Sequence, residues 1–255
     1  MANIPIALQL HTVREQLAED PVSTIQEVAK IGYAGVEGGP PGDMSNSAWL
    51  ELLSDNGLQI IGTGGNPVVL RENLSKLVDD CNELGVTYVM TGIGGELKKN
   101  DNDWKKVVAD LAEGCAKATE AGLKILYHNH AFEFETKVDG QYGLDYLFDT
   151  IPASDLGAEL DVYWVQTGGE DPIAYINKYA DRSPRLHLKD RAPSPEDETC
   201  AFAEVGHGIL DWDGIFAAVE GTPIEWYAVE QDRWIRHPIE CARMSFDYLK
   251  SRGMA

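Results

Sequence analysis

Short apolar runs of strand length recur along the chain, and longer stretches with helical spacing separate them. The runs read as continuously apolar rather than strictly alternating, which favours parallel strands covered by helices. Eight runs can be counted, at 4–10, 34–37, 58–62, 87–91, 124–128, 157–161, 185–189 and 226–230.

The stretches between the runs predict amphipathic helices. Three apolar stripes recur every three or four positions, over 70–84, 104–118 and 239–249. Helix starts are indicated where a capping side chain precedes a proline, at Asp20-Pro21, Asn66-Pro67 and Asp171-Pro172. Gly57, Gly85 and Gly122 stand where a left-handed residue would end a helix.

Eight strands alternating with helices over roughly 250 residues predict an α/β fold, a (β/α)₈ TIM barrel formed by residues 1–255 as a single domain. A doubly wound sheet should carry a glycine-rich phosphate loop after its first strand, but Gln9-Leu10-His11-Thr12 stands there. Gly62-Thr63-Gly64-Gly65 and Gly92-Ile93-Gly94-Gly95 lack the last glycine of that motif and are interpreted as tight turns after strands.

Charge and cysteine usage narrow the partners and the compartment. Forty-two acidic against 21 basic residues give a net charge of −21, which disfavours nucleic acid and anionic membranes as partners. The cysteines Cys81, Cys115, Cys200 and Cys241 form no C-x-x-C pair. No secretory signal and no apolar stretch of membrane-spanning length is evident. We therefore expect a cytoplasmic protein, and the sequence leaves a homo-oligomer open.

Polar residues close several of the predicted strands. Asp161, His187 and Glu230 end the sixth, seventh and eighth, whose C-terminal ends are neighbours on the rim of a barrel where active sites lie. Alone, Asp161 could cap a turn and His187 could be a core histidine. Together they predict a site for one divalent ion, Mn²⁺, Co²⁺, Mg²⁺ or Zn²⁺, because carboxylate and imidazole ligands without thiolate suit these ions.

The fourth ligand has several candidates around the end of the fifth strand. His128, His130 and Glu133 all lie at or just beyond it. Glu133 would complete a carboxylate-rich site, whereas His128 would serve if the strand ends earlier.

Segments over nearly the whole chain resemble the xylose-isomerase-like sugar isomerases and epimerases. They are 7–15, 31–37, 127–130 with 132–134, 161–164, 187–191, 206–212 and 229–232. The resemblance implies a TIM barrel holding one divalent ion through Glu, Asp, His and Glu, and a small carbohydrate as substrate. Asp161, His187 and Glu230 match three of these ligands. Many relatives carry the first glutamate where this chain has Tyr127 or His128, so Glu133 or a histidine takes its place.

Such a site favours proton movement next to a carbonyl. The ion would chelate two substrate oxygens and stabilise the enediolate that forms when a carbon-bound proton leaves. We assign Glu230 to one face of the substrate and Glu133 or His130 to the other. We therefore expect the protein to catalyse isomerisation or epimerisation of a sugar, keto-sugar or polyol.

Other residues near the strand ends are candidates for substrate contacts. Lys189 and Arg191 could bind hydroxyls or a developing oxyanion, and Trp164 could stack on a sugar ring. Gln9 and His11 close the first strand, and His128 is a further candidate.

The sequence also has to be weighed against three other functions. A lyase or dehydratase of a keto-sugar or inosose would use the same site, with the histidines around Asn129 assisting the leaving group. An abasic-site endonuclease would need more metal ligands and a basic groove, which the charge of −21 opposes. A sugar-binding protein without turnover would not need acids on both sides of a metal.

Overall fold

The computed structural model describes residues 4–94, 97, 103–194, 196 and 201–254. Met1–Asn3, Gly95, Cys200 and part of the segment between Arg191 and Gly206 lie outside these residues.

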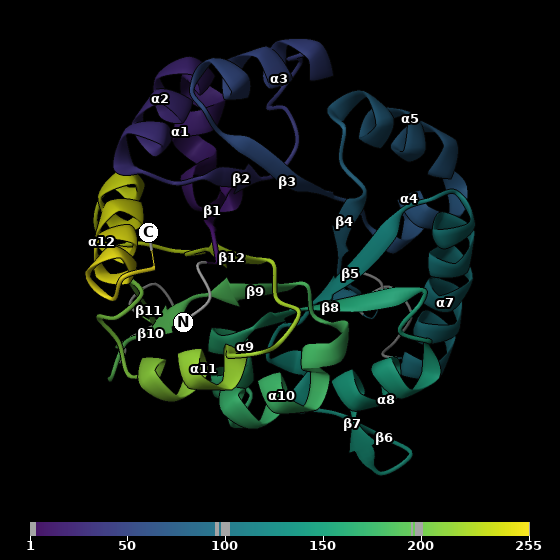
Figure 1. Cartoon of the computed structure of the whole chain (residues 1–255). Coiled ribbons are helices and arrows are strands. Elements are labelled where there is room, and N and C mark those ends of the chain that lie inside the picture. Colours follow the sequence, from purple (N-terminus) through teal and green to yellow (C-terminus); the bar gives the residue numbers. More distant parts are fainter. Residues whose placement is uncertain (1–3, 95–96, 98–102, 195, 197–200, 255) are drawn as a thin grey trace.

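Eight parallel strands form a closed barrel, in the order β1-β12-β9-β8-β5-β4-β3-β2 (Figure 1). Every predicted apolar run overlaps one of them, so the TIM barrel is confirmed. That residues 1–255 form one domain stays a prediction. The strands are β1 (Ile6–Gln9), β2 (Gly35–Glu37), β3 (Gln59–Gly64), β4 (Tyr88–Thr91), β5 (Lys124–His128), β8 (Leu156–Asp161), β9 (Arg185–Leu188) and β12 (Trp226–Val229).

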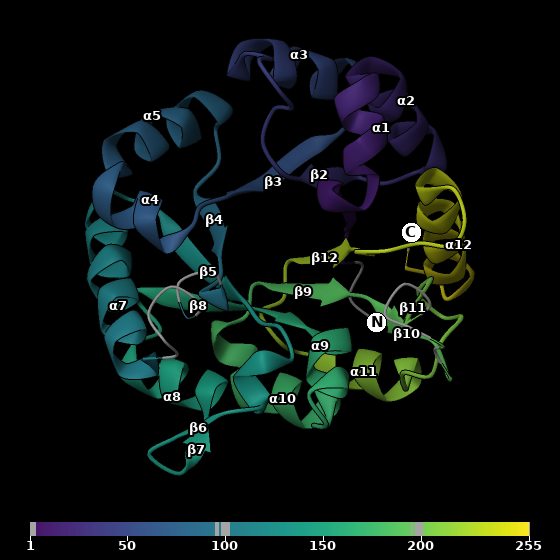
Figure 2. The ribbon, with the colours of Figure 1, turned by 180° about the vertical axis from the view of Figure 1, so that it is seen from behind.

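Helices surround the barrel on its outside (Figures 1 and 2). Asp20, Asn66 and Asp171 cap helices that begin at the following proline, as their sequence predicts. The helices are α1 (Arg14–Glu19), α2 (Pro21–Ile31), α3 (Asn46–Asp55), α4 (Pro67–Glu72), α5 (Leu74–Leu84), α7 (Trp104–Glu120), α8 (Gly143–Thr150), α9 (Val162–Thr167), α10 (Pro172–Tyr179), α11 (Trp212–Val219) and α12 (Pro238–Ser251). Among the described residues, none of these helices is long and apolar enough to cross a bilayer.

Several shorter elements lie outside the eight-stranded barrel. Three 3₁₀ turns, η1 (Leu10–Val13), η2 (Phe132–Phe134) and η3 (Ala180–Arg182), follow β1, β5 and α10. Two hairpins add β6 (Lys137–Val138) with β7 (Gln141–Tyr142), and β10 (Asp190–Arg191) with β11 (Phe202–Ala203).

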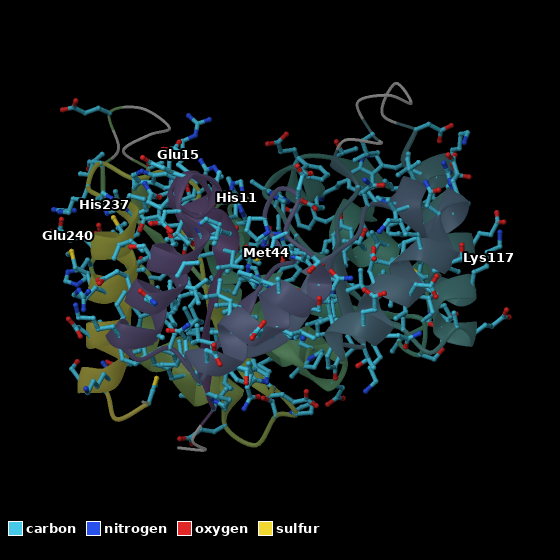
Figure 3. All side chains as sticks on the ribbon, turned by 90° about the horizontal axis from the view of Figure 1, so that it is seen from above. His11, Glu15, Met44, Lys117, His237 and Glu240 are labelled. Atoms are coloured by element: carbon cyan, nitrogen blue, oxygen red, sulfur yellow. The ribbon has the colours of Figure 1, made fainter. Side chains whose placement is uncertain are left out.

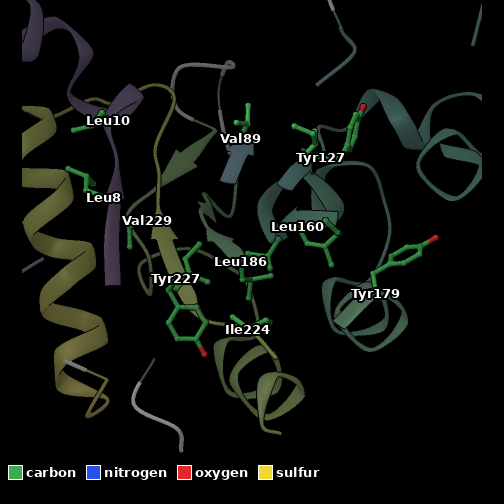
Figure 4. Packing of buried hydrophobic residues seen from close by; sticks show 14 of the residues in the cluster. Leu8, Leu10, Val89, Tyr127, Leu160, Tyr179, Leu186, Ile224, Tyr227 and Val229 are labelled. Atoms are coloured by element: carbon green, nitrogen blue, oxygen red, sulfur yellow. The ribbon is translucent and has the colours of Figure 1, made fainter. Parts of the chain in front are cut away.

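The apolar core includes one side of each strand. Leu8, Leu160, Leu186 and Val229 belong to a single cluster with residues of the surrounding helices (Figure 4). The other side of several strands is charged. Because successive residues of a strand point to opposite faces, Arg185, His187 and Lys189 share one face and leave Leu186 and Leu188 on the other.

This alternation differs from the continuously apolar strands that the sequence suggested. Glu37, Glu159, Arg185 and His187 are all buried, with at most 1% exposure. Glu37 on β2 contacts His187 on β9, although β1 and β12 separate these strands in the sheet. The contact must therefore cross the inside of the barrel, whose lumen carries charge.

Gly62 leaves the space that this charged lumen needs. The expectation of a tight turn at Gly62–Gly65 is wrong for its first three residues, because Gly62, Thr63 and Gly64 continue β3. A Cβ atom on Gly62 would lie 2.5 Å from Nη1 of Arg185 and 2.9 Å from the backbone oxygen of Tyr88.

Replacing Gly62 with alanine should therefore lower the free energy of unfolding by about 1–3 kcal/mol, the usual cost of overpacking a core. Gly64→Ala is the matched control, since it lies on the same strand and a Cβ there would meet nothing within 4 Å. Denaturant unfolding measures both variants, and equal stabilities would contradict the steric argument.

Candidate metal centre

Four side chains converge at the C-terminal mouth of the barrel. His128, Asp161, His187 and Glu230 are buried, and each offers one ligand atom within 4.8 Å of all the others. Nε2 of His128 lies 3.1 Å from Oδ2 of Asp161, and Nδ1 of His187 lies 3.1 Å from Oε2 of Glu230. We call these four residues the cup. Two imidazole nitrogens and two carboxylate oxygens at this separation fit a single divalent ion.

The strands fix where each cup residue stands. His128 and Asp161 are the last residues of β5 and β8, and Glu230 directly follows β12. The Asn129 side chain ties two of these strand ends together: its oxygen accepts the Asp161 backbone N–H at 2.9 Å, and its Nδ2 donates to the Asp161 carbonyl oxygen. Asp161 also caps α9, since its Oδ1 accepts the Trp164 backbone N–H. Its capping role and its place in the cup therefore coexist, one oxygen serving each.

Lys189 lies beside the cup and contacts its acids. Its Nζ is 3.0 Å from Oδ2 of Asp161, 2.9 Å from Oε2 of Glu230 and 2.6 Å from Oδ2 of Asp232. Burial would raise the pKa of Asp161, but Lys189 and the nearby histidines outweigh it and lower that pKa to about 2. Asp161 is therefore ionised at neutral pH, and its Oδ2 is suited to bind a divalent cation.

His187 joins the cup to the charged lumen. Its Nε2 lies 2.9 Å from Oε2 of Glu37 and 3.3 Å from Oε1 of Glu159. Burial alone would lower its pKa, but Glu159, Glu230 and Glu37 outweigh burial and raise the pKa well above its ordinary value. An ion bound at Nδ1 would take the place of a proton there.

A pocket of about 380 Å³ opens next to the cup, and its lining includes His130, Trp164, Arg191, Phe202 and Asp232. The rings of His130 and Trp164 are 5.2 Å apart, and the rings of His130 and His128 are 5.0 Å apart. Burial lowers the pKa of His130 to about 3, so its ring is neutral near pH 7. The pocket thus presents a neutral imidazole, a flat indole and a guanidinium near the cup.

Glu133, the carboxylate that the sequence offered as a fourth ligand, is not part of the cup. It lies in η2, fully buried, where one oxygen accepts the Tyr127 hydroxyl at 2.8 Å and the other accepts the His130 backbone N–H at 2.9 Å. Burial raises its pKa to about 8 despite these two donors. The geometry instead brings in His128, because β5 continues to that residue.

Gln9 and His11 do not line the pocket. The Gln9 side chain accepts the His11 backbone N–H and lies 3.5 Å from Glu37 in the lumen. His11 is exposed at the mouth end of β1, as Figure 3 shows near the labelled Glu15.

Asp190 holds the rim next to the cup. Its carboxylate accepts the backbone N–H groups of Arg191, Gly206, Gly208 and Leu210, and the Trp212 indole N–H at 2.7 Å. The turn around His207 is thereby fixed to β10, which begins two residues after β9 ends.

Sequence patterns did not indicate that Glu37, Glu159 and Arg185 contact one another in the lumen, or that Asp232 pairs with Lys189. A signal was available. Glu159 stands two residues before Asp161, and Arg185 two residues before His187, so each pair shares one face of a strand. Once Asp161 and His187 were placed inside the mouth, the earlier member of each pair had to lie deeper in the barrel.

Comparison with known proteins agrees with this architecture. The family described as xylose isomerase-like TIM barrel matches residues 25–252 of the chain. Among solved structures, a sugar phosphate isomerase/epimerase from Parabacteroides distasonis is 23% identical, with a TM-score of 0.80 over 97% of this chain and 98% of its own. A structure of the IOLI protein with a bound zinc atom is 16% identical, with a TM-score of 0.73 over 98% of both chains.

Among curated relatives, an inosose dehydratase of Clostridium perfringens is 28% identical over 174 residues. That match covers 62% of this chain and 58% of the relative, so it spans less than two thirds of the relative's length.

Proposed function

Because the chain belongs to the xylose isomerase-like TIM barrel family, we propose that it is a divalent-metal-dependent isomerase or epimerase of a sugar, keto-sugar or polyol. The observation that carries the proposal is the cup, in which His128, Asp161, His187 and Glu230 gather four donor atoms beside a pocket. When bound, the ion would act as a Lewis acid on adjacent substrate oxygens and make a neighbouring C–H bond more acidic.

The side chains around the pocket suit proton transfer next to a carbonyl. We assign Glu230 to proton removal on one face of the substrate, and the neutral His130 to proton transfer on the other. Glu133 would hold His130 in place through its backbone N–H rather than reach the substrate. Trp164 offers a face on which a sugar ring can stack, and Arg191 can donate to substrate oxygens. Lys189 would reduce the repulsion between the Asp161 and Glu230 carboxylates, because its ammonium group contacts both.

A dehydratase is the second candidate, and the similarity to an inosose dehydratase favours it. Both reactions begin with removal of a proton next to a carbonyl. They differ in whether that proton returns to carbon or a hydroxyl leaves as water.

Product analysis in deuterated water tests the proposal and separates its two forms. The metal-loaded protein would be incubated with a panel of keto-sugars and an inosose, and followed by NMR and mass spectrometry. Epimerisation or isomerisation should place deuterium on carbon without loss of water, whereas dehydration lowers the product mass by one water.

Metal analysis of the purified protein should accompany that assay, with about one ion per chain expected at the cup. Absence of both metal binding and solvent exchange across the panel would contradict the enzymatic proposal.

A further inference from the structure

The lumen carboxylate of Glu37 faces a nitrogen of His187 that the cup does not use. Glu37 ends β2 and is 1% exposed, and its Oε2 lies 2.9 Å from Nε2 of His187. Nδ1 of the same ring points into the cup, 3.1 Å from Oε2 of Glu230. The two nitrogens of this ring therefore face different environments.

Arg185 holds Glu37 in this orientation. Its Nη1 lies 2.5 Å from Oε1 of Glu37, while its Nη2 donates to the Ile61 carbonyl oxygen. The guanidinium also stacks on the Tyr88 ring, 4.6 Å from its centroid. One Glu37 oxygen is thus committed to Arg185, and the other lies 2.9 Å from Nε2 of His187 and 3.5 Å from Nε2 of Gln9.

We propose that Glu37 is a positioning residue for the metal centre, fixing the tautomer and ring orientation of His187 from inside the barrel. A neutral imidazole carries its hydrogen on one nitrogen only. Donation from Nε2 to Glu37 leaves the Nδ1 lone pair directed into the cup, which is the form that binds a metal. This inference rests on the proposed metal centre and assigns a function to a carboxylate that stands outside the cup.

Glu159 is the competing partner, since its Oε1 lies 3.3 Å from the same Nε2. Arg185 is also farther from it, at 3.7 Å compared with 2.5 Å for Glu37. The shorter distances and the firmer anchoring favour Glu37. The two acids form a matched pair for an experiment, because both are buried lumen carboxylates that approach one ring nitrogen.

The test compares Glu37→Gln, Glu37→Leu and Glu159→Gln with the unaltered protein. Zn²⁺ affinity would be measured by calorimetry, and the His187 tautomer by NMR of ¹⁵N-labelled histidine at alkaline pH, where the ring is neutral. Glu37→Leu should weaken Zn²⁺ binding about 10- to 100-fold, the usual effect of losing the partner of a ligating histidine. Glu37→Gln should keep the Nε2–H tautomer, because its amide oxygen still accepts, and should lose less affinity. Glu159→Gln should change the affinity less than Glu37→Leu and leave the tautomer unchanged.

Each of the following outcomes would contradict one part of the proposal. Equal Zn²⁺ affinity and an unchanged tautomer in Glu37→Leu would overturn the role of Glu37 while leaving the metal centre intact. An effect of Glu159→Gln as large as that of Glu37→Leu would show that only the buried charge matters. Failure of the unaltered protein to bind Zn²⁺ would overturn the metal centre itself, and the positioning role with it. Thermal unfolding of each variant separates a local effect on the ring from loss of the fold.

Discussion

The Glu230→Gln substitution should reduce turnover at least a hundredfold, because losing an acid–base group costs about 10²–10⁴ in rate. Glu230 is 6% exposed, and its Oε2 contacts both His187 and Lys189. Burial would raise its pKa, but Lys189 and the histidines outweigh burial and hold the pKa well below its ordinary value. The carboxylate is therefore ionised at neutral pH, and the amide removes its charge while nearly keeping its shape.

Initial rates and metal content should be measured together for this variant. Retained metal with lost turnover would support proton transfer by Glu230, whereas loss of both would assign it mainly to metal binding. Glu225→Gln is the matched control, because Glu225 is exposed near the opposite end of the same strand. Turnover of Glu230→Gln within tenfold of the unaltered protein would contradict the assignment.

The Arg185→Met substitution should lower the free energy of unfolding by about 3–5 kcal/mol, because removing the guanidinium leaves the buried charge of its acidic partners uncompensated. Arg185 is 1% exposed and lies between Glu37 and Glu159. Burial disfavours ionised Glu37, and His187 and Arg185 together reverse that effect and lower its pKa to about 2. Without the guanidinium, His187 would be the one basic side chain left in contact with both Glu37 and Glu159 among the described residues.

Denaturant unfolding checks this expectation. Arg243→Met serves as the control, since Arg243 pairs with Glu27 at the surface with roughly two fifths of each side chain exposed. Such pairs contribute about 0–1 kcal/mol, so that variant should be nearly as stable as the unaltered protein. A similar, small loss for Arg185→Met would show that the lumen tolerates the acids without this cation.

The barrel could be predicted from sequence because its signals are repeated. Each strand has its own apolar run, and proline after Asp20, Asn66 and Asp171 begins a helix as expected. Asp161, His187 and Glu230 could be brought together for a similar reason, since the ends of successive parallel strands meet on one rim.

The fourth donor depended on a local detail that no periodicity encodes. The predicted run 124–128 and β5 end at the same residue, so the strand boundary did not decide between His128 and Glu133. The turn after β5 decided it, because it buries Glu133 against the Tyr127 hydroxyl and the His130 backbone N–H. The lumen network was missed for another reason: Glu37 and Arg185 are distant in the chain, and each looks like an ordinary polar residue at the end of a strand.

Asp190 anchors the rim that follows β9 through contacts that do not involve the cup residues. Asp190 pairs with Ala203 in the β10–β11 hairpin and collects N–H groups from the turn that follows it. The chain that leaves the barrel after β9 is thus gathered again at a single carboxylate before α11 begins. On the proposed function, substitutions at Arg191 or Phe202, which line the pocket on this hairpin, would change which molecules bind while leaving the cup residues in place.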